Sequence, residues 1–321
     1  MSDQPFALLL AGPTASGKSA LALALAERLG GTVINADSMQ VYAGLRAITA
    51  RPDAAEEARA PHRLYGVHDA GTAASVAWWR GQALAEMAAA RLPILCGGTG
   101  LYFNALTEGL SEIPPVPPEA REEARGLLAA LGPAALHVRL AEADPDTAAR
   151  LRPSDSQRLA RAWEVWRGTG RGMAAWQAVP GTGTAQRGGV AWRFAAIRLD
   201  PPRDALRAAI GQRWQGMLAA GAVEEVAALV ARGLDPTLPA MRAHGVPEIA
   251  AALRGEISME EAGRRACLAT GQYTKRQATW FRHRPLAGAT DTHTIHARVA
   301  GQEQFSESEW AEIIAFIDRR R

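Results

Sequence analysis

The stretch Gly12-Pro13-Thr14-Ala15-Ser16-Gly17-Lys18-Ser19 decides the fold of this chain, because it matches the pattern G-x-x-x-x-G-K-[ST] in full. The apolar run Phe6–Ala11 before it predicts a β-strand, and a helical pattern follows from Lys18 to about residue 29. In such a unit, backbone N–H groups converge on phosphate oxygens at the helix N-terminus, where the helix dipole favours negative charge. The pattern therefore predicts a phosphate-binding loop in which Lys18 neutralises the terminal phosphate and Ser19 holds Mg²⁺.

Two further apolar runs predict a parallel sheet around this loop. The runs are Thr32–Ala36 and Leu92–Cys96, and a helical pattern over Val76–Arg91 leads into the second run. Alternating strands and helices, with turns at the carboxyl ends of the strands, are typical of α/β folds. Ligands of such folds bind at those carboxyl ends. The expected fold class is therefore α/β, with a P-loop NTPase-like parallel-sheet core.

A change in composition predicts a second, helical part of the chain. The run Ile113-Pro114-Pro115-Val116-Pro117-Pro118 indicates a stiff, extended linker, because proline fits neither a helix interior nor a central strand. The pattern is then helical over 119–168, with breaks near Gly132-Pro133 and Pro153, and a glycine-rich stretch follows over 180–189. We therefore expect a helical insertion domain over residues 112–185, within a catalytic core formed by residues 1–111 and 186–321.

The composition excludes several classes of protein. The chain has 321 residues, 48% hydrophobic and 21% charged, so it can bury a core and is not a disordered chain. Its two cysteines cannot form a disulfide framework or a four-ligand zinc site, which favours a reduced, cytoplasmic setting. No apolar run approaches the roughly 18 residues of a membrane helix, so no membrane association is expected. The net charge of +3 permits nucleic-acid binding without requiring it, and lysine occurs only at Lys18 and Lys275.

Two polar residues follow the predicted strands. Asp37 comes directly after the second apolar run, where a carboxylate can serve as a general base or orient the ligands of Mg²⁺. Asp is also a common helix N-cap, and the spacing favours neither interpretation. Thr99 lies in the glycine cluster 97–100, which suits either a substrate contact or a glycine turn packed over core aromatics.

Basic residues gather at two places further along the chain. Arg158 and Arg161 share a polar face at the start of a predicted helix in the insertion, next to Gln157. Such faces are usually only solvated, but this one also suits a nucleotide and its phosphate. Arg213 and the run 272–282 also bring basic residues, with aromatic residues in the run, which suits RNA binding or simple helix packing. The spacing leaves both open.

Six motifs occur in an order that resembles the bacterial tRNA dimethylallyltransferases. They are Gly12–Ser19, Asn35–Tyr42, Ala60–Leu64, Gly97–Thr99, Gln157–Ala162 and Lys275–Arg282. Enzymes of this family prenylate the adenosine immediately 3′ of the anticodon, at tRNA position 37. The resemblance spans nearly the whole chain, and the joint pattern is far more specific than the phosphate loop alone.

The resemblance implies a role for each matching residue. The diphosphate of dimethylallyl diphosphate, rather than ATP, would bind to Gly12, Pro13, Thr14, Ala15, Ser16, Gly17, Lys18, Ser19 and Arg213. Asp37 would be the general base for the adenine N6 amino group, and Thr99 would lie next to the target base. The tRNA would further contact Asp37, Ser38, Met39, Gln40, Thr99, Arg121, Gln157, Arg158, Leu159, Ala160 and Arg161. The catalytic set would be Asp37, Lys18, Ser19 and Thr99.

The resemblance also implies the partners of the chain. These are the anticodon stem-loop of a tRNA, dimethylallyl diphosphate and Mg²⁺, with the chain acting as a monomer. Two positions depart from the family pattern. The segment His244–Glu248 stands where a Gly-Tyr-Arg/Lys element is frequent, and Gly271 stands where arginine is common. Neither departure involves the predicted reaction centre.

Two other functions fit the phosphate loop. One is a P-loop kinase that binds ATP and phosphorylates a small metabolite, although Leu92–Cys96 is followed by Gly97-Gly98-Thr99 and not by the carboxylate that holds Mg²⁺ in such enzymes. The other is a nucleotide-regulated RNA-binding protein without catalysis, against which Asp37 beside the loop argues. Dimethylallyl transfer to tRNA is the function we expect.

Overall fold

The computed structural model describes residues 4–179, 181, 183–187, 189–301 and 304–321. The chain divides into two compact units, one formed by Met1–Glu108 with Thr184–Arg321 and the other by Gly109–Gly183. The sequence placed the limits of the insertion at residues 112 and 185. Positions 180, 182 and 188 of the glycine-rich stretch lie outside the described residues.

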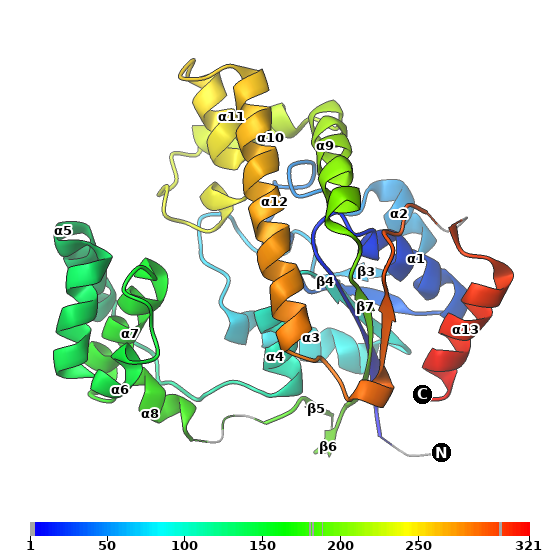
Figure 1. Cartoon of the computed structure of the whole chain (residues 1–321), viewed down its shortest axis with the longest axis horizontal. Helices are drawn as coiled ribbons and strands as arrows, with labels where there is room; N and C mark the ends of the chain where they lie inside the picture. Colours follow the sequence, from blue (N-terminus) through cyan, green and yellow to red (C-terminus); the bar gives the residue numbers. More distant parts are fainter. Residues whose placement is uncertain (1–3, 180, 182, 188, 302–303) are drawn as a thin grey trace. The chain divides into compact units, whose positions relative to one another are not determined.

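The first unit is built on a six-stranded sheet with the order β3-β2-β4-β1-β7-β8, in which every pairing is parallel. The strands are β1 (Phe6–Ala11), β2 (Thr32–Asn35), β3 (His62–Arg63), β4 (Pro93–Gly97), β7 (Arg193–Leu199) and β8 (Thr292–Ile295). The predicted α/β fold with a P-loop-type parallel core is confirmed (Figure 1). A short antiparallel pair, β5 (Gln186–Arg187) and β6 (Val190–Ala191), lies outside this sheet.

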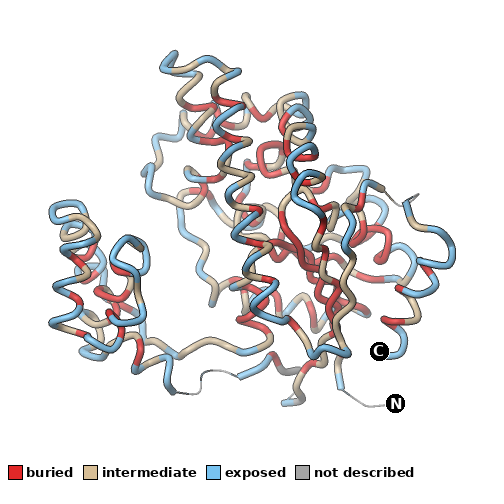
Figure 2. The backbone as a smooth tube through the Cα atoms, in the orientation of Figure 1, coloured by how far each residue is buried: buried red, intermediate tan, exposed pale blue. Residues whose placement is uncertain are grey.

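The central strand β1 is buried on both faces, which explains its uninterrupted apolar sequence. Phe6, Leu8 and Leu10 belong to one hydrophobic cluster, whereas Ala7, Leu9 and Ala11 belong to another, as the two-residue period of a strand requires. Figure 2 shows the buried residues concentrated along the sheet. The carboxyl end of β1 is thereby fixed at the start of the phosphate loop.

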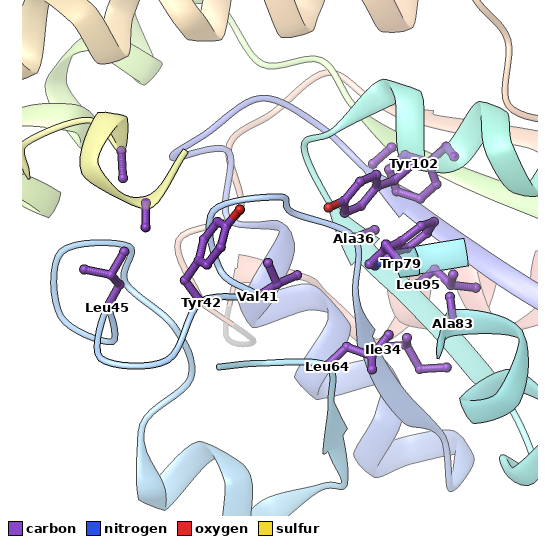
Figure 3. Packing of buried hydrophobic residues seen from close by; sticks show 14 of the residues in the cluster. Ile34, Ala36, Val41, Tyr42, Leu45, Leu64, Trp79, Ala83, Leu95 and Tyr102 are labelled. Carbon is purple, nitrogen blue, oxygen red and sulfur yellow. The ribbon is translucent and has the colours of Figure 1, made fainter. Parts of the chain in front are cut away.

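Different helices pack into the two hydrophobic clusters. The first contains residues of α1 (Lys18–Leu29) and α13 (Glu307–Asp318). The second contains residues of α3 (Val76–Ala89), α4 (Gly100–Thr107), α9 (Arg203–Ala219), α10 (Ala222–Ala231), α11 (Val246–Leu253) and α12 (Met259–His283). In this second cluster the Trp79 and Tyr102 rings stack with centroids 4.1 Å apart, close to Ile34 and Leu95 (Figure 3). Trp79 also donates its indole N–H to the Asn35 carbonyl oxygen at 2.8 Å, which ties α3 to the end of β2.

The second unit is helical. It consists of α5 (Pro118–Ala143), α6 (Pro145–Ala148), α7 (Ser156–Thr169) and α8 (Met173–Gln177). The predicted break at Gly132-Pro133 is confirmed, because Gly132 has φ 75° and ψ 170° inside α5. A small core of its own, including Leu136, Leu140, Leu159 and Trp163, holds α5 and α7 together.

The remaining short elements are α2 (Ala54–Arg59), η1 (Ala240–Arg242) and η2 (Ala289–Asp291). Within the described residues, no helix combines the length and the apolar character that crossing a membrane demands.

Candidate active site

The phosphate loop connects β1 to α1 through two residues with positive φ. Ala15 has φ 64°, and Gly17, which precedes the first helical residue, has φ 89°. The loop closes on itself, because Ser16 donates its N–H to the Pro13 carbonyl oxygen at 3.2 Å and Lys18 donates its Nζ to the same oxygen at 3.3 Å. The Ser16 hydroxyl is buried without a hydrogen-bond partner among the described residues. An unsatisfied buried donor at the start of a helix suits an anionic ligand.

A side chain from α12 ties the phosphate loop to the second glycine cluster. Gln277, which is 4% exposed, accepts hydrogen bonds through Oε1 from the backbone N–H and the hydroxyl of Thr14, at 2.8 and 3.1 Å. Its Nε2 donates to the Gly98 carbonyl oxygen at 3.0 Å. A Cβ atom on Gly98 would lie 2.1 Å from that Nε2, so a larger residue there would displace the Gln277 amide. The lack of a side chain at Gly98 therefore leaves room for the Gln277 amide.

Asp37 is held at the carboxyl end of β2 by a local network. Its N–H donates to Asn35 Oδ1 at 2.8 Å, and its Oδ1 accepts from the Met39 N–H at 2.9 Å. Its carboxylate thus closes a short turn and is not the N-cap of an α-helix, because the next helix begins at Ala54. Thr99 accepts a hydrogen bond from the Ser38 N–H at 3.0 Å, which joins the turn to the end of β4.

The cations of the site are withdrawn from water. Burial lowers the pKa of Lys18, and the nearby Arg213 lowers it further, whereas Cys96 and Asp37 act in the opposite direction. Burial also lowers the pKa of Arg213, which donates Nη2 to the Thr49 carbonyl oxygen at 2.7 Å. Arg213 Nε is buried without a partner among the described residues. Bound negative charge would relieve both the desolvation of these cations and their mutual repulsion.

An apolar pocket of about 70 Å³ opens beside these groups. Its polar lining residues include Thr14, Asp37 and Arg213. Its walls include Met39, Ile48, Ile210, Trp214, Met217 and Ala266. Apart from Met39, which was expected to contact tRNA, none of these wall residues was predicted from the sequence. The only indication was the apolar spacing of residues 210, 214 and 217, which is equally typical of a helix packed in a core.

Two aromatic residues complete the pocket next to Thr99. Burial raises the pKa of Tyr273 to about 12, although Thr99 and Gln277 act in the opposite direction. The His244 ring lies against the Tyr273 ring with centroids 5.1 Å apart and lines the same pocket as Asp37. The expectation that the departure at His244–Glu248 does not involve the reaction centre is therefore wrong. Burial lowers the pKa of His244, so its imidazole is neutral at pH 7. Both rings therefore present uncharged surfaces to the pocket.

Ser19, in the first turn of α1, is the residue that can contact a metal ion. It is exposed. Burial raises the pKa of the nearby Cys96 to about 12, although Ser19 acts in the opposite direction, so Cys96 stays a thiol. The part of the chain that the structure describes contains no group of three or more His, Cys, Asp or Glu side chains suited to a metal. Mg²⁺ does not need one when it retains water and phosphate oxygens. These residues fit a Mg²⁺ ion carried by a diphosphate.

The other predicted tRNA contacts lie in the helical unit. Arg121 is exposed in the first turn of α5, and Gln157 and Arg158 are exposed in the first turn of α7. Arg158 pairs with Asp155 at 3.4 Å, and Arg161 pairs with Glu164 at 3.1 Å. The last two predicted contacts, Leu159 and Ala160, lie in the core of this unit. Their side chains support α7 from inside.

A parallel sheet with a P-loop-type turn and a largely apolar pocket beside it defines the class of P-loop-type α/β proteins. The family model "IPP transferase" matches residues 40–284, and the model "Isopentenyl transferase" matches residues 6–72. The chain therefore belongs to the IPP transferase family of tRNA dimethylallyltransferases, and it is a prenyltransferase. These matches do not favour the kinase interpretation.

Individual relatives agree with this assignment. A tRNA dimethylallyltransferase of Granulibacter bethesdensis is 62% identical over 97% of both chains, and one of Acidiphilium cryptum is 61% identical over 97% of this chain and 94% of its own. Among solved structures, the tRNA isopentenylpyrophosphate transferase of Bacillus halodurans is 30% identical, with a TM-score of 0.67 and coverage of 99% and 98%. A eukaryotic dimethylallyltransferase acting on tRNA, 23% identical with a TM-score of 0.79 and coverage of 98% and 80%, shares the fold.

Proposed function

We propose that this chain transfers the dimethylallyl group of dimethylallyl diphosphate to N6 of adenosine 37 in tRNA and releases diphosphate. The observation that carries the proposal is the pocket itself. Thr14 of the phosphate loop, Asp37 and Arg213 line the same cavity as the apolar side chains of Trp214 and Met217. A ligand with a diphosphate head and a short hydrocarbon tail fits such a cavity.

The size of the pocket agrees with a five-carbon tail. A single water needs about 10–15 Å³, so the 70 Å³ cavity has room for several groups of that size. Burying five carbons contributes at most about 4 kcal/mol, whereas micromolar affinity needs about 8 kcal/mol. The diphosphate must therefore supply the remainder, through the loop residues 12–19 and Arg213.

The transfer needs a base and a stabilised leaving group. The N6 lone pair forms a bond to C1 of the prenyl group while the C1–O bond breaks, and diphosphate leaves with the electron pair. We assign Asp37 as the acceptor of the N6 proton, a role worth about 10²–10⁴-fold in rate. Lys18 and Arg213 stabilise the charge that builds on the diphosphate, and such preorganised electrostatics is usually the larger contribution. Thr99 and Tyr273 hold the segment Asp37–Gln40 beside the adenine.

Mg²⁺ is the proposed cofactor. When bound, it would act as a Lewis acid on the diphosphate oxygens. Ser19 is the residue that would contact it, since its hydroxyl is exposed beside the loop.

The proposed acceptor is the anticodon stem-loop of tRNA. Residues Asp37–Gln40 and Thr99 would contact the target nucleotide, which must leave its stack at a cost of a few kcal/mol. Exposed residues of the helical insertion, including Arg121, Gln157, Arg158 and Arg161, would contact the anticodon loop and offset that cost. We also propose that the chain acts as a monomer. A tRNA substrate also places the proposed reaction in the cytoplasm.

One assay tests the function. The protein is incubated with unmodified tRNA, Mg²⁺ and either prenyl-labelled dimethylallyl diphosphate or γ-labelled ATP. We expect label in the tRNA only from the prenyl donor. A matched tRNA with guanosine at position 37 lacks the N6 amine and should remain unlabelled. Transfer of label from ATP, or equal labelling of both tRNAs, would contradict the proposal.

A further inference from the structure

The segment that follows β8 crosses the phosphate loop. Val299 donates its backbone N–H to the Ser16 carbonyl oxygen at 2.9 Å, and Arg298 donates its Nε to the Ala15 carbonyl oxygen at 3.1 Å. A Cβ atom on Gly17 would lie 1.7 Å from the Val299 carbonyl oxygen. Three consecutive loop residues thus contact two consecutive residues that lie about 283 positions later in the chain. We name Arg298–Val299 the C-terminal strap.

The strap fixes the direction of the loop's peptide groups. In a planar trans peptide, the carbonyl oxygen and the following N–H point in opposite directions. Because the Ser16 carbonyl accepts from Val299, the Gly17 N–H of the same peptide points away from the strap. The side of the loop opposite the strap is the one where a bound anion must receive its donors.

The strap also holds a strained residue. Ala15 has φ 64°, a conformation that costs a residue with a Cβ atom about 1–2 kcal/mol. Such a residue keeps this conformation only when its surroundings impose it. The Arg298 hydrogen bond to the carbonyl of Ala15 itself is a contact of that kind.

The strap is anchored by α13. Val299 is 2% exposed and belongs to the same cluster as Trp310 and Ile317 of α13 and Leu21 of α1. The Arg28 guanidinium of α1 lies 4.4 Å from the centroid of the Trp310 ring. Figure 1 shows α13 beside α1, the helix that starts at the loop. Helix α1 therefore begins at the phosphate loop and also packs against α13, the helix that anchors the strap.

We propose that the C-terminal strap is a positioning element of the diphosphate site. Arg298 and Val299 hold the peptides of residues 15–17 so that the Gly17 N–H is directed at the leaving group. The proposal rests on the proposed function and deepens it. Arg298 acts through Ala15, so it is a positioning residue and not a catalytic one.

The test is a titration of the full-length protein with inorganic diphosphate and Mg²⁺. We expect Arg298→Ala to weaken diphosphate binding about tenfold, the loss of one hydrogen bond made by a charged donor. Arg319→Ala is the matched control, because Arg319 is exposed in the same C-terminal region and its loss removes the same charge. It should bind diphosphate like the wild type. Equal affinities of the wild type and Arg298→Ala would overturn the strap proposal alone, whereas a wild type that does not bind diphosphate would overturn the proposed function as well.

Two further variants separate positioning from charge attraction. Arg298→Gln keeps an N–H donor without the charge, so positioning predicts that it recovers most of the affinity. A Gln variant as weak as the Ala variant would overturn the proposal.

In the Ala15→Gly background, where the positive φ costs nothing, Arg298→Ala should weaken binding only about threefold. In prenyl transfer, Arg298→Ala should lower kcat/KM for the donor and leave the KM for tRNA unchanged, and a rise in the KM for tRNA of the same size would indicate general damage.

Discussion

The predicted diphosphate site, with Lys18 and Arg213, and the N-terminal half of α7, with Arg158 and Arg161, both carry cations that the sequence predicts to bind substrate, yet the two regions are built differently. Burial lowers the pKa of Lys18 and of Arg213, and one buried guanidinium nitrogen of Arg213 has no partner among the described residues. In α7, Arg158 and Arg161 are more exposed and pair with acids three residues away on or beside the same helix. Desolvated, incompletely paired cations indicate a ligand, whereas exposed ion pairs do not distinguish a binding face from a solvated one.

Interactions in the two regions should depend differently on salt concentration. Interactions in the loop are partly shielded from solvent, so ions screen them weakly. Interactions of α7 with RNA phosphates would release counterions and weaken steeply as salt increases. Substitutions in the loop should therefore lower the rate of prenyl transfer, whereas substitutions in α7 should lower tRNA affinity and its salt dependence.

The largest effect is expected in the loop. Lys18→Met and Asp37→Asn should each lower the rate of prenyl transfer at least about 100-fold, because the first loses charge at the leaving group and the second loses the base. Asn at position 37 still accepts the Met39 N–H bond, so the turn should persist. Single-turnover transfer and filter binding of tRNA measure the two outcomes. tRNA affinity should stay within about twofold, and a tRNA affinity that falls as far as the rate would break the contrast with α7.

The second-largest effect is expected for donor binding in the apolar pocket, and it distinguishes the pocket from the phosphate loop. Ala266 is 1% exposed and lines the pocket, so Ala266→Leu places three extra carbons where the prenyl group is expected. Excluding two or three carbons should weaken donor binding by about 2 kcal/mol, or roughly thirtyfold. Competition experiments with dimethylallyl diphosphate and with inorganic diphosphate measure this. Only the binding of dimethylallyl diphosphate should be affected. An equal loss of affinity for both ligands would show that the apolar pocket and the phosphate loop are not separate binding regions.

A smaller effect is expected in α7. Arg158→Ala combined with Arg161→Ala should weaken tRNA binding and reduce the slope of log affinity against log salt by about 1.5, the sum for two phosphate contacts. Binding of inorganic diphosphate serves as the control and should not change. A salt slope identical to that of the wild type would make this face a solvated one.

The smallest effect concerns pH. Burial holds the pKa of His244 below its ordinary value of 6.5, although Glu248 and Asp37 act in the opposite direction and Arg276 acts with burial. The unfolded chain therefore binds a proton that the folded chain resists, and folding stability is lost as pH falls below about 6.5. His244→Gln should make the fall of Tm between pH 7.5 and 5 shallower. The fall should not vanish, because burial also lowers the pKa of His293. An unchanged pH profile would show that His244 protonates freely in the pocket.

Much of the fold followed from local patterns. The strand–loop–helix unit around Gly12–Ser19, the parallel sheet and the break at Gly132 were predicted because each depends on residues close together in sequence. The family followed from the order of six short motifs. The roles of Asp37 and of Arg158 in the reaction stay predictions, because a residue's chemistry depends on a substrate that the chain itself does not contain.

The pocket followed from no such pattern. Its apolar wall combines Ile48 with residues of α9 and α12, and Trp214 has the same spacing and burial as an ordinary core tryptophan. The bond from Gln277 to Thr14 spans 263 positions, and the strap spans 283. No local periodicity encodes a contact over such a distance.

The sequence by itself determined that a strand, a tight loop and a helix would follow one another over residues 6–29, because glycine, lysine and serine at fixed spacing favour that loop through backbone sterics and helix polarity. Only the tertiary structure decided how large the apolar cavity beside that loop would be and which distant residues would brace it. Those properties arise when helices far apart in the chain pack on one sheet, and packing is a sum over neighbours in space that the order of residues does not name.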